Sequence, residues 1–339
     1  MKVAALSYAT SQGLSHLLKA FYDHGLVTHP IIMRHPASRR EPNMHWYPRG
    51  TPVVSGPRHR SWGRALEVIS SADVFLAFET FFDWSIIDFC RRRNTKTVLM
   101  PMYEWTPARM SHKPDLMLCP SLLDRDYLGG EFLTVPVDPS HWKLRTRADR
   151  FLHNAGNVGC REHKGTRQLL EAIPLVQNPD FRITVRAQDE RALRSIVQGC
   201  PAAESDPRCK IEYGEIPYEK LWDDHDVLIA PEKQNGLSLP LQEGWAAGMA
   251  VMTTDRYPMN AWLPKELLIP VERYEKAHNG GCIEFDSAVV NPRDIAATID
   301  AWIGKDISQF SLAGKAWADT NSWPVLLPRY REILEGLLR

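Results

Sequence analysis

The stretch at residues 213–255 constrains the fold of this 339-residue chain more than any other part of it. It contains a short apolar run at residues 226–230, which predicts a buried strand. A glycine-containing loop follows, and then a helical pattern with small residues on one face. A second apolar run at residues 250–254 completes a strand–loop–helix–strand unit, which indicates a parallel α/β sheet.

The loop inside this unit, residues 231–238, is the first candidate functional site. Doubly wound sheets bind their ligands at the carboxyl ends of their strands, and this loop follows such an end. The free backbone N–H groups at the start of the next helix suit an anion such as a phosphate. Glu243 lies just inside that helix, where a carboxylate can accept hydrogen bonds from two sugar hydroxyls. The pattern therefore indicates a nucleotide-sugar pocket; the alternative is that Glu232 and Glu243 are ordinary solvated charges.

The residues from Glu243 to Val251, in the order Glu-Gly-Trp-Ala-Ala-Gly-Met-Ala-Val, resemble a known family signature. It is that of the retaining glycosyltransferases of family 4, which use nucleotide sugars. On this resemblance Glu243 would hold the nucleotide ribose. The family has another glutamate eight positions earlier, where this chain has Asn235. An amide can still donate and accept hydrogen bonds to a donor sugar, and Glu232 is a candidate substitute.

The resemblance implies an α/β chain with the GT-B fold, in which two Rossmann-like doubly wound domains face each other across a cleft. Residues 1–147 would form an acceptor domain and residues 148–318 a donor domain. Residues 319–339 would form a helix that packs back on the first domain. A proline-broken segment at residues 135–142 precedes the expected boundary.

A second loop, residues 156–166, follows a predicted strand at residues 151–155 and precedes a predicted helix. A glycine-bearing loop that enters a helix with Arg161 and Lys164 beside it is an anion cradle. Lys164 and Gly165 resemble the Lys-Gly element with which family 4 holds the donor diphosphate. Fixed cations directed at the departing diphosphate would lower the barrier to transfer. The alternative is a surface loop with chance basic residues.

The residues expected to bind the donor are Gly156, Asn157, Lys164, Arg186, Gly214, Ile216, Glu232, Asn235, Gly236, Leu237, Ser238 and Glu243. Arg186 would end a strand near the cleft, and the backbone at Gly214 and Ile216 would contact the base. The residues expected to take part in catalysis are Lys164, Arg161, Glu243 and Glu104.

The first half of the chain opens with a predicted strand at residues 2–8, a turn containing Ser11, Gln12 and Gly13, and a helix. The resemblance implies that this turn faces the acceptor, although an ordinary connecting turn is an equal alternative. Glu79 and Glu104 follow two further predicted strands. Because these carboxyls would end adjacent strands, one of them is expected to bind or orient the acceptor hydroxyl.

A basic, aromatic stretch at residues 34–64 is too irregular for a core element. It carries seven arginines against a single acid, Glu41, and includes the expected acceptor-binding residues Arg39, Arg40, Arg58 and Arg60. The charge is local, because residues 1–150 carry 20 Lys+Arg against 14 Asp+Glu, and residues 151–339 carry 21 against 27. These features favour an anionic acceptor, and the alternative is a solvated covering loop.

Other classes of protein are disfavoured. The six cysteines show no metal-binding or disulfide spacing, so we expect no metal and no cofactor beyond the nucleotide sugar as co-substrate. The first residues lack a signal-peptide pattern, and no apolar run approaches a membrane span, so a cytoplasmic protein without a transmembrane segment is expected.

The sequence therefore predicts an enzyme that moves a sugar from a nucleotide diphosphate sugar to a hydroxyl, with retention implied by the resemblance. Hydroxylated bases in DNA, or a phosphorylated glycan or glycolipid, are candidate acceptors. A nucleotide-sugar epimerase on the same fold is one alternative. A non-catalytic module that binds sugar nucleotides or nucleic acid is another.

Overall fold

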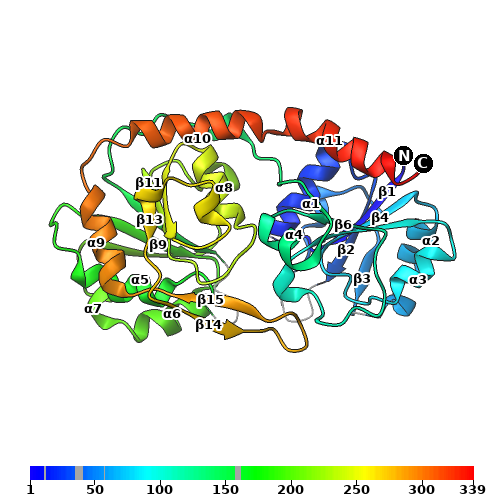
Figure 1. Ribbon diagram of the computed structural model, residues 1–339, viewed down its shortest axis with the longest axis horizontal. Helices are drawn as coiled ribbons and strands as arrows, with labels where there is room; N and C mark the ends of the chain where they lie inside the picture. The colour runs from blue at the N-terminus through cyan, green and yellow to red at the C-terminus, as the bar shows by residue number, and fades with distance from the viewer. Residues whose placement is uncertain (11–12, 35–40, 57, 157–161) are drawn as a thin grey trace. The chain divides into compact units, whose positions relative to one another are not determined.

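A computed structural model describes residues 1–10, 13–34, 41–56, 58–156 and 162–339 (Figure 1). It divides into two compact units. Unit 1 consists of Met1–Pro136, His278–Glu284 and Trp323–Arg339, and unit 2 consists of Val137–Ala277 and Phe285–Ser322. Each unit contains one parallel sheet, which confirms the predicted α/β class.

The sheet of unit 1 has seven strands in the order β3-β2-β1-β4-β5-β6-β7, and every pairing in it is parallel. The strands are β1 Val3–Ser7, β2 His29–Arg34, β3 Val53–Ser55, β4 Val74–Glu79, β5 Lys96–Pro101, β6 Leu116–Cys119 and β7 Glu131–Phe132. The strand order reverses between β1 and β4. Such a switch point is where doubly wound sheets open a crevice for a ligand.

The helices of unit 1 are α1 Gly13–Asp23, α2 Arg64–Ser70, α3 Ile86–Arg91, α4 Leu122–Leu128 and α11 Trp323–Gly336. Short 3-10 turns lie at η1 Met44–Trp46, η2 His59–Ser61 and η3 Tyr103–Trp105. Helix α11 lies beside α1 (Figure 1), and the ring of Phe21 is 5.2 Å from that of Trp323 and 5.0 Å from that of Tyr330. The Tyr330 hydroxyl donates to the Thr134 carbonyl at 2.9 Å, so the last helix is fixed by both packing and a hydrogen bond.

The sheet of unit 2 has six parallel strands in the order β10-β9-β8-β11-β12-β13. They are β8 Phe151–Gly156, β9 Ile183–Ala187, β10 Cys209–Tyr213, β11 Val227–Ala230, β12 Ala250–Thr254 and β13 Leu268–Ile269. The order reverses between β8 and β11. The switch point of unit 2 is therefore flanked by residues 162–166 and 231–238, which belong to the two loops that the sequence singles out.

The helices of unit 2 are α5 Thr166–Ala172, α6 Glu190–Gln198, α7 Pro201–Glu204, α8 Leu239–Ala246, α9 Pro292–Trp302 and α10 Ser308–Thr320. Its 3-10 turns are η4 Pro139–His141, η5 Ile173–Leu175, η6 Tyr218–Lys220, η7 Met259–Ala261 and η8 Lys265–Leu267. Side chains of α5, α6, α8 and α9 share one buried apolar cluster with the central strands. Gly244 of α8 permits close packing, because a Cβ there would lie 2.7 Å from a methyl of Leu228 on β11.

An antiparallel hairpin, β14 Arg273–Ala277 and β15 Phe285–Val289, completes unit 2. Its tip, residues 278–284, belongs to unit 1. There the Asn279 side chain donates to the Glu104 carbonyl at 2.9 Å, and the Ala108 N–H donates to the Gly281 carbonyl at 3.1 Å.

Candidate functional site

The candidate site of unit 2 is formed by loops that leave the carboxyl ends of β8 and β11. Lys164 comes from the first loop, and Glu232 and Ser238 come from the second. The Lys164 ammonium lies 2.6 Å from the Glu232 carboxylate, and their side chains are only 12% and 1% exposed. The Ser238 hydroxyl donates to the same carboxylate oxygen at 2.8 Å. Three residues that the sequence assigns to one pocket are thus in direct contact.

The second carboxylate oxygen of Glu232 distinguishes this ion pair from a purely structural one. Oε2 is buried and has no hydrogen-bond partner among the residues that the structure describes. A buried acceptor without a donor costs about 1–3 kcal/mol. A ligand hydroxyl placed there would remove this cost. The oxygen is therefore a candidate acceptor for a bound sugar.

Gly165 explains how Lys164 reaches Glu232. Its φ of +68° lies in the left-handed region, and a Cβ on it would lie 2.1 Å from the Pro231 carbonyl oxygen. Only glycine permits this approach of the first loop to the end of β11. On the other side of Lys164, the His163 carbonyl accepts from the Lys233 N–H at 2.8 Å. The two loops are joined through their backbones as well as through the ion pair.

Asn235 occupies the position of the family's first glutamate, but its side chain has a local partner. Its Oδ1 accepts from the Ser238 N–H at 2.9 Å, directly before helix α8. Its carbonyl accepts from the Arg256 guanidinium at 2.8 Å. Ser238 itself has φ +42°, a conformation that costs energy for a residue other than glycine. Asn235 thus stabilises the turn that presents Gly236, Leu237 and Ser238.

Glu243 lies half-buried in the first turns of α8 and accepts from the Tyr218 hydroxyl at 2.9 Å. Burial raises the pKa of Glu243 to about 7, while the Tyr218 hydrogen bond and the charge of Lys164 lower it. Glu243 therefore lies within the electrostatic field of Lys164. At neutral pH, a pKa near 7 populates both its neutral and its ionised form.

Two neutral histidines at this edge were not predicted from the sequence. His153 on β8 is fully buried, with Nδ1 2.8 Å from the Ile229 carbonyl and Nε2 2.9 Å from the Thr166 hydroxyl. Burial, and after it the Lys164 charge, lower the pKa values of both His153 and His163 to about 4. Both imidazoles beside Lys164 are therefore uncharged at neutral pH.

The other residues predicted to bind the donor sugar nucleotide lie elsewhere in unit 2. Gly156 ends β8 with φ +60°, and Gly214 follows β10 with φ +105° and donates to the Ala187 carbonyl at 3.0 Å. Ile216 lies two residues further along the same turn. Arg186 is bonded elsewhere, because its guanidinium contacts Glu212 at 3.0 Å. It lines a separate cavity on one face of the sheet.

In unit 1, Glu79 ends β4 beside the switch point of its sheet. Its φ is +68°, and that of Phe82 is +60°, so two residues of this turn adopt the left-handed conformation without being glycine. Burial raises the pKa of Glu79 to about 7. Burial, followed by the Glu79 carboxyl, also raises the pKa of Tyr8. Backbone strain beside a buried carboxyl is typical of functional sites.

Glu104 lies in η3, after β5, and β5 is the neighbour of β4 in the sheet. It is half-buried, whereas Trp105 beside it is 40% exposed. Gly13 is exposed and begins α1. Arg58 and Arg60 flank His59, which is buried against Asp83 at 2.6 Å, and both arginines are exposed. Six predicted site residues lie outside the described residues: Ser11, Gln12, Arg39, Arg40, Asn157 and Arg161.

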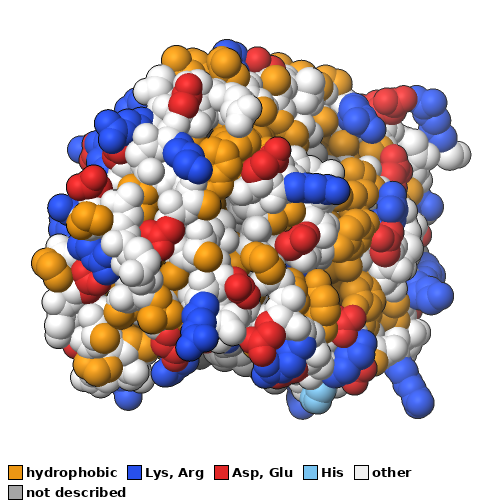
Figure 2. Space-filling view, turned by 60° about the vertical axis from the view of Figure 1, so that its left-hand side comes forward, with side chains coloured by type: hydrophobic (Ala, Val, Ile, Leu, Met, Phe, Trp, Pro, Cys, Tyr) orange, Lys and Arg blue, Asp and Glu red, His pale blue; other side chains and the backbone are white. Residues whose placement is uncertain are grey.

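Charged side chains of both signs are mixed on one face of the molecule (Figure 2). On the face shown in Figure 2, Lys and Arg side chains are interspersed with Asp and Glu side chains. No helix among the described residues is long and apolar enough to cross a membrane. The described cysteines, at positions 90, 119, 200, 209 and 282, are all free thiols.

Three solved structures are similar to this chain over nearly its whole length. A glycosyltransferase from Rickettsia africae ESF-5 is 12% identical with a TM-score of 0.67, covering 100% of this chain and 98% of that one. Anabaena Alr3699/HepE in complex with UDP-glucose is 10% identical with a TM-score of 0.69, covering 99% and 100%. Sucrose-phosphate synthase from Thermosynechococcus elongatus is 14% identical with a TM-score of 0.66, covering 99% and 98%.

No protein-family model matches the sequence, and no curated protein matches it. The similarity is one of fold. Together with the two parallel sheets, it confirms the predicted GT-B architecture.

Proposed function

We propose that this protein is a glycosyltransferase that moves a sugar from a nucleotide diphosphate sugar to an acceptor hydroxyl, with retention at the anomeric carbon. The observation that carries the proposal is the buried contact between Lys164 and Glu232 at the switch point of unit 2, 2.6 Å long. The fold supports it, because the similar structures include a glycosyltransferase and a complex with UDP-glucose. UDP-glucose is therefore the first donor to test.

Lys164 would neutralise the leaving diphosphate. As the bond between the anomeric carbon and the diphosphate oxygen breaks, negative charge grows on that oxygen, and a preorganised ammonium stabilises it. The new bond forms between the anomeric carbon and the acceptor oxygen, whose proton passes to the departing diphosphate. Glu232 would hold Lys164 in place through Oε1 and accept a donor-sugar hydroxyl at Oε2.

Glu243 would bind the ribose of the donor in its ionised form, because a carboxylate accepts two hydroxyl hydrogen bonds. The hydrogen bond from the Tyr218 hydroxyl would fix the orientation of one carboxylate oxygen of Glu243. The backbone of Gly236 and Leu237, and Asn235 with it, would meet the sugar and phosphates. Gly214 and Ile216 would meet the base.

The acceptor would bind to unit 1, with Glu79 contacting its hydroxyl and Glu104 nearby. The strained turn at Glu79 supports this assignment. The exposed Arg58 and Arg60 support an anionic acceptor, either a nucleic acid with hydroxylated bases or a phosphorylated glycan or glycolipid.

The test is UDP-glucose binding and turnover by the native protein, Lys164→Ala, Glu243→Ala and Lys143→Ala. Lys143 is a matched control, because it also forms a 2.6 Å ion pair, with Asp223, but is 53% exposed. Binding to the native protein should raise its melting temperature. Lys164→Ala and Glu243→Ala should abolish the rise, and Lys143→Ala should keep it. If no nucleotide sugar in a panel raises the melting temperature, the proposal is wrong.

Two assays distinguish the alternatives. An epimerase would convert the donor sugar in the absence of any acceptor. A binding module would give the same thermal shift and lose it in the same variants, but would show no turnover with any acceptor.

A further inference from the structure

A cavity of about 390 Å³ lies in unit 2, on a face formed by β8, β9, β10 and the residues before them. It begins at the amino ends of β8 and β9, opposite the ends that carry Lys164 and Glu232. Its lining includes five cations, Arg150, Arg182, Arg186, Arg208 and Lys210, against two carboxylates, Glu212 and Asp224. Its volume is within the range of small-molecule pockets, about 300–1,000 Å³.

The strands β9 and β10 alternate between apolar and polar side chains here. On β9, Ile183 and Val185 are buried in the core, while Thr184 and Arg186 line the cavity. On β10, Lys210 pairs across from Thr184, and Glu212 pairs across from Arg186. Strands of a parallel sheet are normally apolar on both faces, since helices cover both. Charged side chains along one face of β9 and β10 therefore depart from the usual pattern of a parallel sheet.

The cations of this face exceed the carboxylates that they contact. Arg186 and Lys210 share one carboxylate, that of Glu212, at 3.0 Å and 2.7 Å. Arg182 is hydrogen-bonded to the carbonyls of Pro179 and Phe181, at 2.8 Å and 2.6 Å, and has no ion pair among the described residues. The group therefore retains positive charge that an anion would neutralise.

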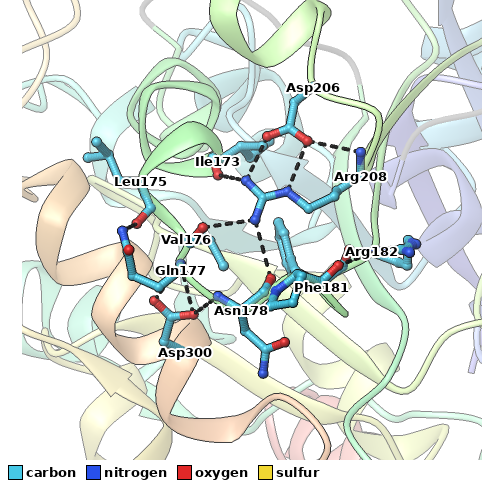
Figure 3. Close-up of polar contacts among 11 residues, drawn as sticks. Ile173, Leu175, Val176, Gln177, Asn178, Phe181, Arg182, Asp206, Arg208 and Asp300 are labelled. Atoms are coloured by element: carbon cyan, nitrogen blue, oxygen red, sulfur yellow. Dashed lines mark hydrogen bonds and ion pairs between the residues drawn. The ribbon is translucent and has the colours of Figure 1, made fainter.

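Arg208 belongs to the wall of the cavity, and its guanidinium is already hydrogen-bonded within the protein. Figure 3 shows its guanidinium turned toward the loop at residues 173–178, where it contacts the carbonyls of Ile173, Val176 and Asn178. Asp206 accepts from it at 2.8 Å. The same loop is fixed from the other side by Asp300, which accepts from the Gln177 and Asn178 N–H groups (Figure 3). The cavity is thus lined by an ordered structure.

His225 supplies a buried polar atom in the same cavity. It is 8% exposed, and its Nδ1 has no hydrogen-bond partner among the described residues. Burial, followed by the charges of Arg186 and Arg150, lowers the pKa of His225 to about 4. The imidazole is therefore neutral and lies in a positive field. An anion bound beside it would partner Nδ1.

We propose that this cavity is a binding site for a small phosphate-bearing anion, held by Arg182, Arg186 and Lys210 with His225 behind them. Guanidinium groups match phosphate oxygens through paired N–H bonds, and the ammonium adds a third charged donor. The site is independent of the proposed sugar transfer, because none of its residues belongs to the Lys164–Glu232 pair.

Calorimetric titration with inorganic phosphate, at constant ionic strength, tests the proposal. The variants are Arg182→Gln and Lys210→Gln, singly and together, because both side chains are exposed and their loss should leave the fold intact. Arg293→Gln is the matched control, since it removes an exposed arginine from the same unit. Lys164→Ala removes any phosphate binding at the other edge.

We expect saturable binding that weakens about tenfold or more in the double variant, because each charge-assisted hydrogen bond is among the stronger kinds. It should persist in Arg293→Gln and in Lys164→Ala. The absence of saturable binding to the native protein would overturn the proposal. So would binding that Lys164→Ala abolishes, or that the double variant retains unchanged.

Discussion

Replacing Gly165 with alanine should damage the candidate site through the backbone alone. Alanine at φ +68° pays the left-handed penalty of about 1–2 kcal/mol, part of which the lower entropy of the unfolded chain offsets. The new Cβ would also lie 2.1 Å from the Pro231 carbonyl, which is backbone that continues β11 and cannot rotate away. Overpacking of this kind costs about 1–3 kcal/mol more. The total expected loss is about 2–4 kcal/mol.

Gly156→Ala is the matched control. Gly156 has nearly the same φ, +60°, and a Cβ there would meet no atom of the described residues within 4 Å. Only the left-handed penalty applies, so the expected loss is about 1 kcal/mol. At about 2–4 °C per kcal/mol for a unit of this size, the melting temperature should fall by about 4–16 °C for Gly165→Ala and about 2–4 °C for Gly156→Ala.

Thermal unfolding followed by circular dichroism measures both variants, and UDP-glucose binding is measured below the transition. Because Gly165 adjoins Lys164, the alanine variant should also weaken donor binding more than its control does. If the two variants lose the same stability, the close contact between Gly165 and Pro231 does not constrain the loop, and the argument for this site geometry fails.

Three further predictions use other contacts. Asn235→Ala should lower the free energy of unfolding by about 1 kcal/mol, because it removes the acceptor for the Ser238 N–H. Asn235→Asp keeps an acceptor and should keep the stability. Equal midpoints of urea unfolding for the two variants would contradict the role of that hydrogen bond. Glu79→Gln should alter the pH dependence of stability. Burial raises the pKa of Glu79 from 4.5 to about 7. The stability that the protonated Glu79 gives the native protein is therefore fully present below about pH 4.5 and is lost as the pH rises through 7. Over that pH range the melting temperature of the native protein should fall relative to that of the variant. A difference that is constant with pH would show that Glu79 is solvated. Tyr218→Phe removes a hydrogen bond that lowers the pKa of Glu243, so donor binding, which needs the carboxylate, should require a higher pH; an unshifted binding profile would argue against Glu243 as the ribose ligand.

The sequence predicts the central strands and the two loops at the switch point of unit 2 because most of these strands are apolar runs. Parallel strands that are buried on both faces leave this simple signal, and β4, β11 and β12 follow it, whereas β8 also contains His153 and Asn154. Lys164 and Glu232 could be predicted as site residues because each lies in a loop that comes after one of these strands. Their contact could not be predicted, because it depends on how closely Gly165 approaches Pro231 in space.

Several parts of the fold leave no comparable signal. The strands β3, β7 and β13 are two or three residues long, and β14 is an exposed, charged run. The pairing of Tyr218 with Glu243, and of His153 with Thr166, joins segments that only the folded sheet brings together. Arg186 was expected near the donor because it lies near the end of a strand. Its partner Glu212 is on the neighbouring strand, and sequence position alone does not say which face either side chain occupies.

Unit 1 is built from three separate segments of the chain, Met1–Pro136, His278–Glu284 and Trp323–Arg339. A ribosome making this protein would therefore release the first 136 residues long before Trp323 and Tyr330 exist to cover Phe21. Until then an apolar surface of α1 stays exposed, which is the condition under which nascent chains aggregate or bind chaperones. An expression fragment that stops at Pro136 would retain that exposed surface permanently. A study of unit 1 in isolation would need the last helix supplied, either as a fused segment or as a separate peptide.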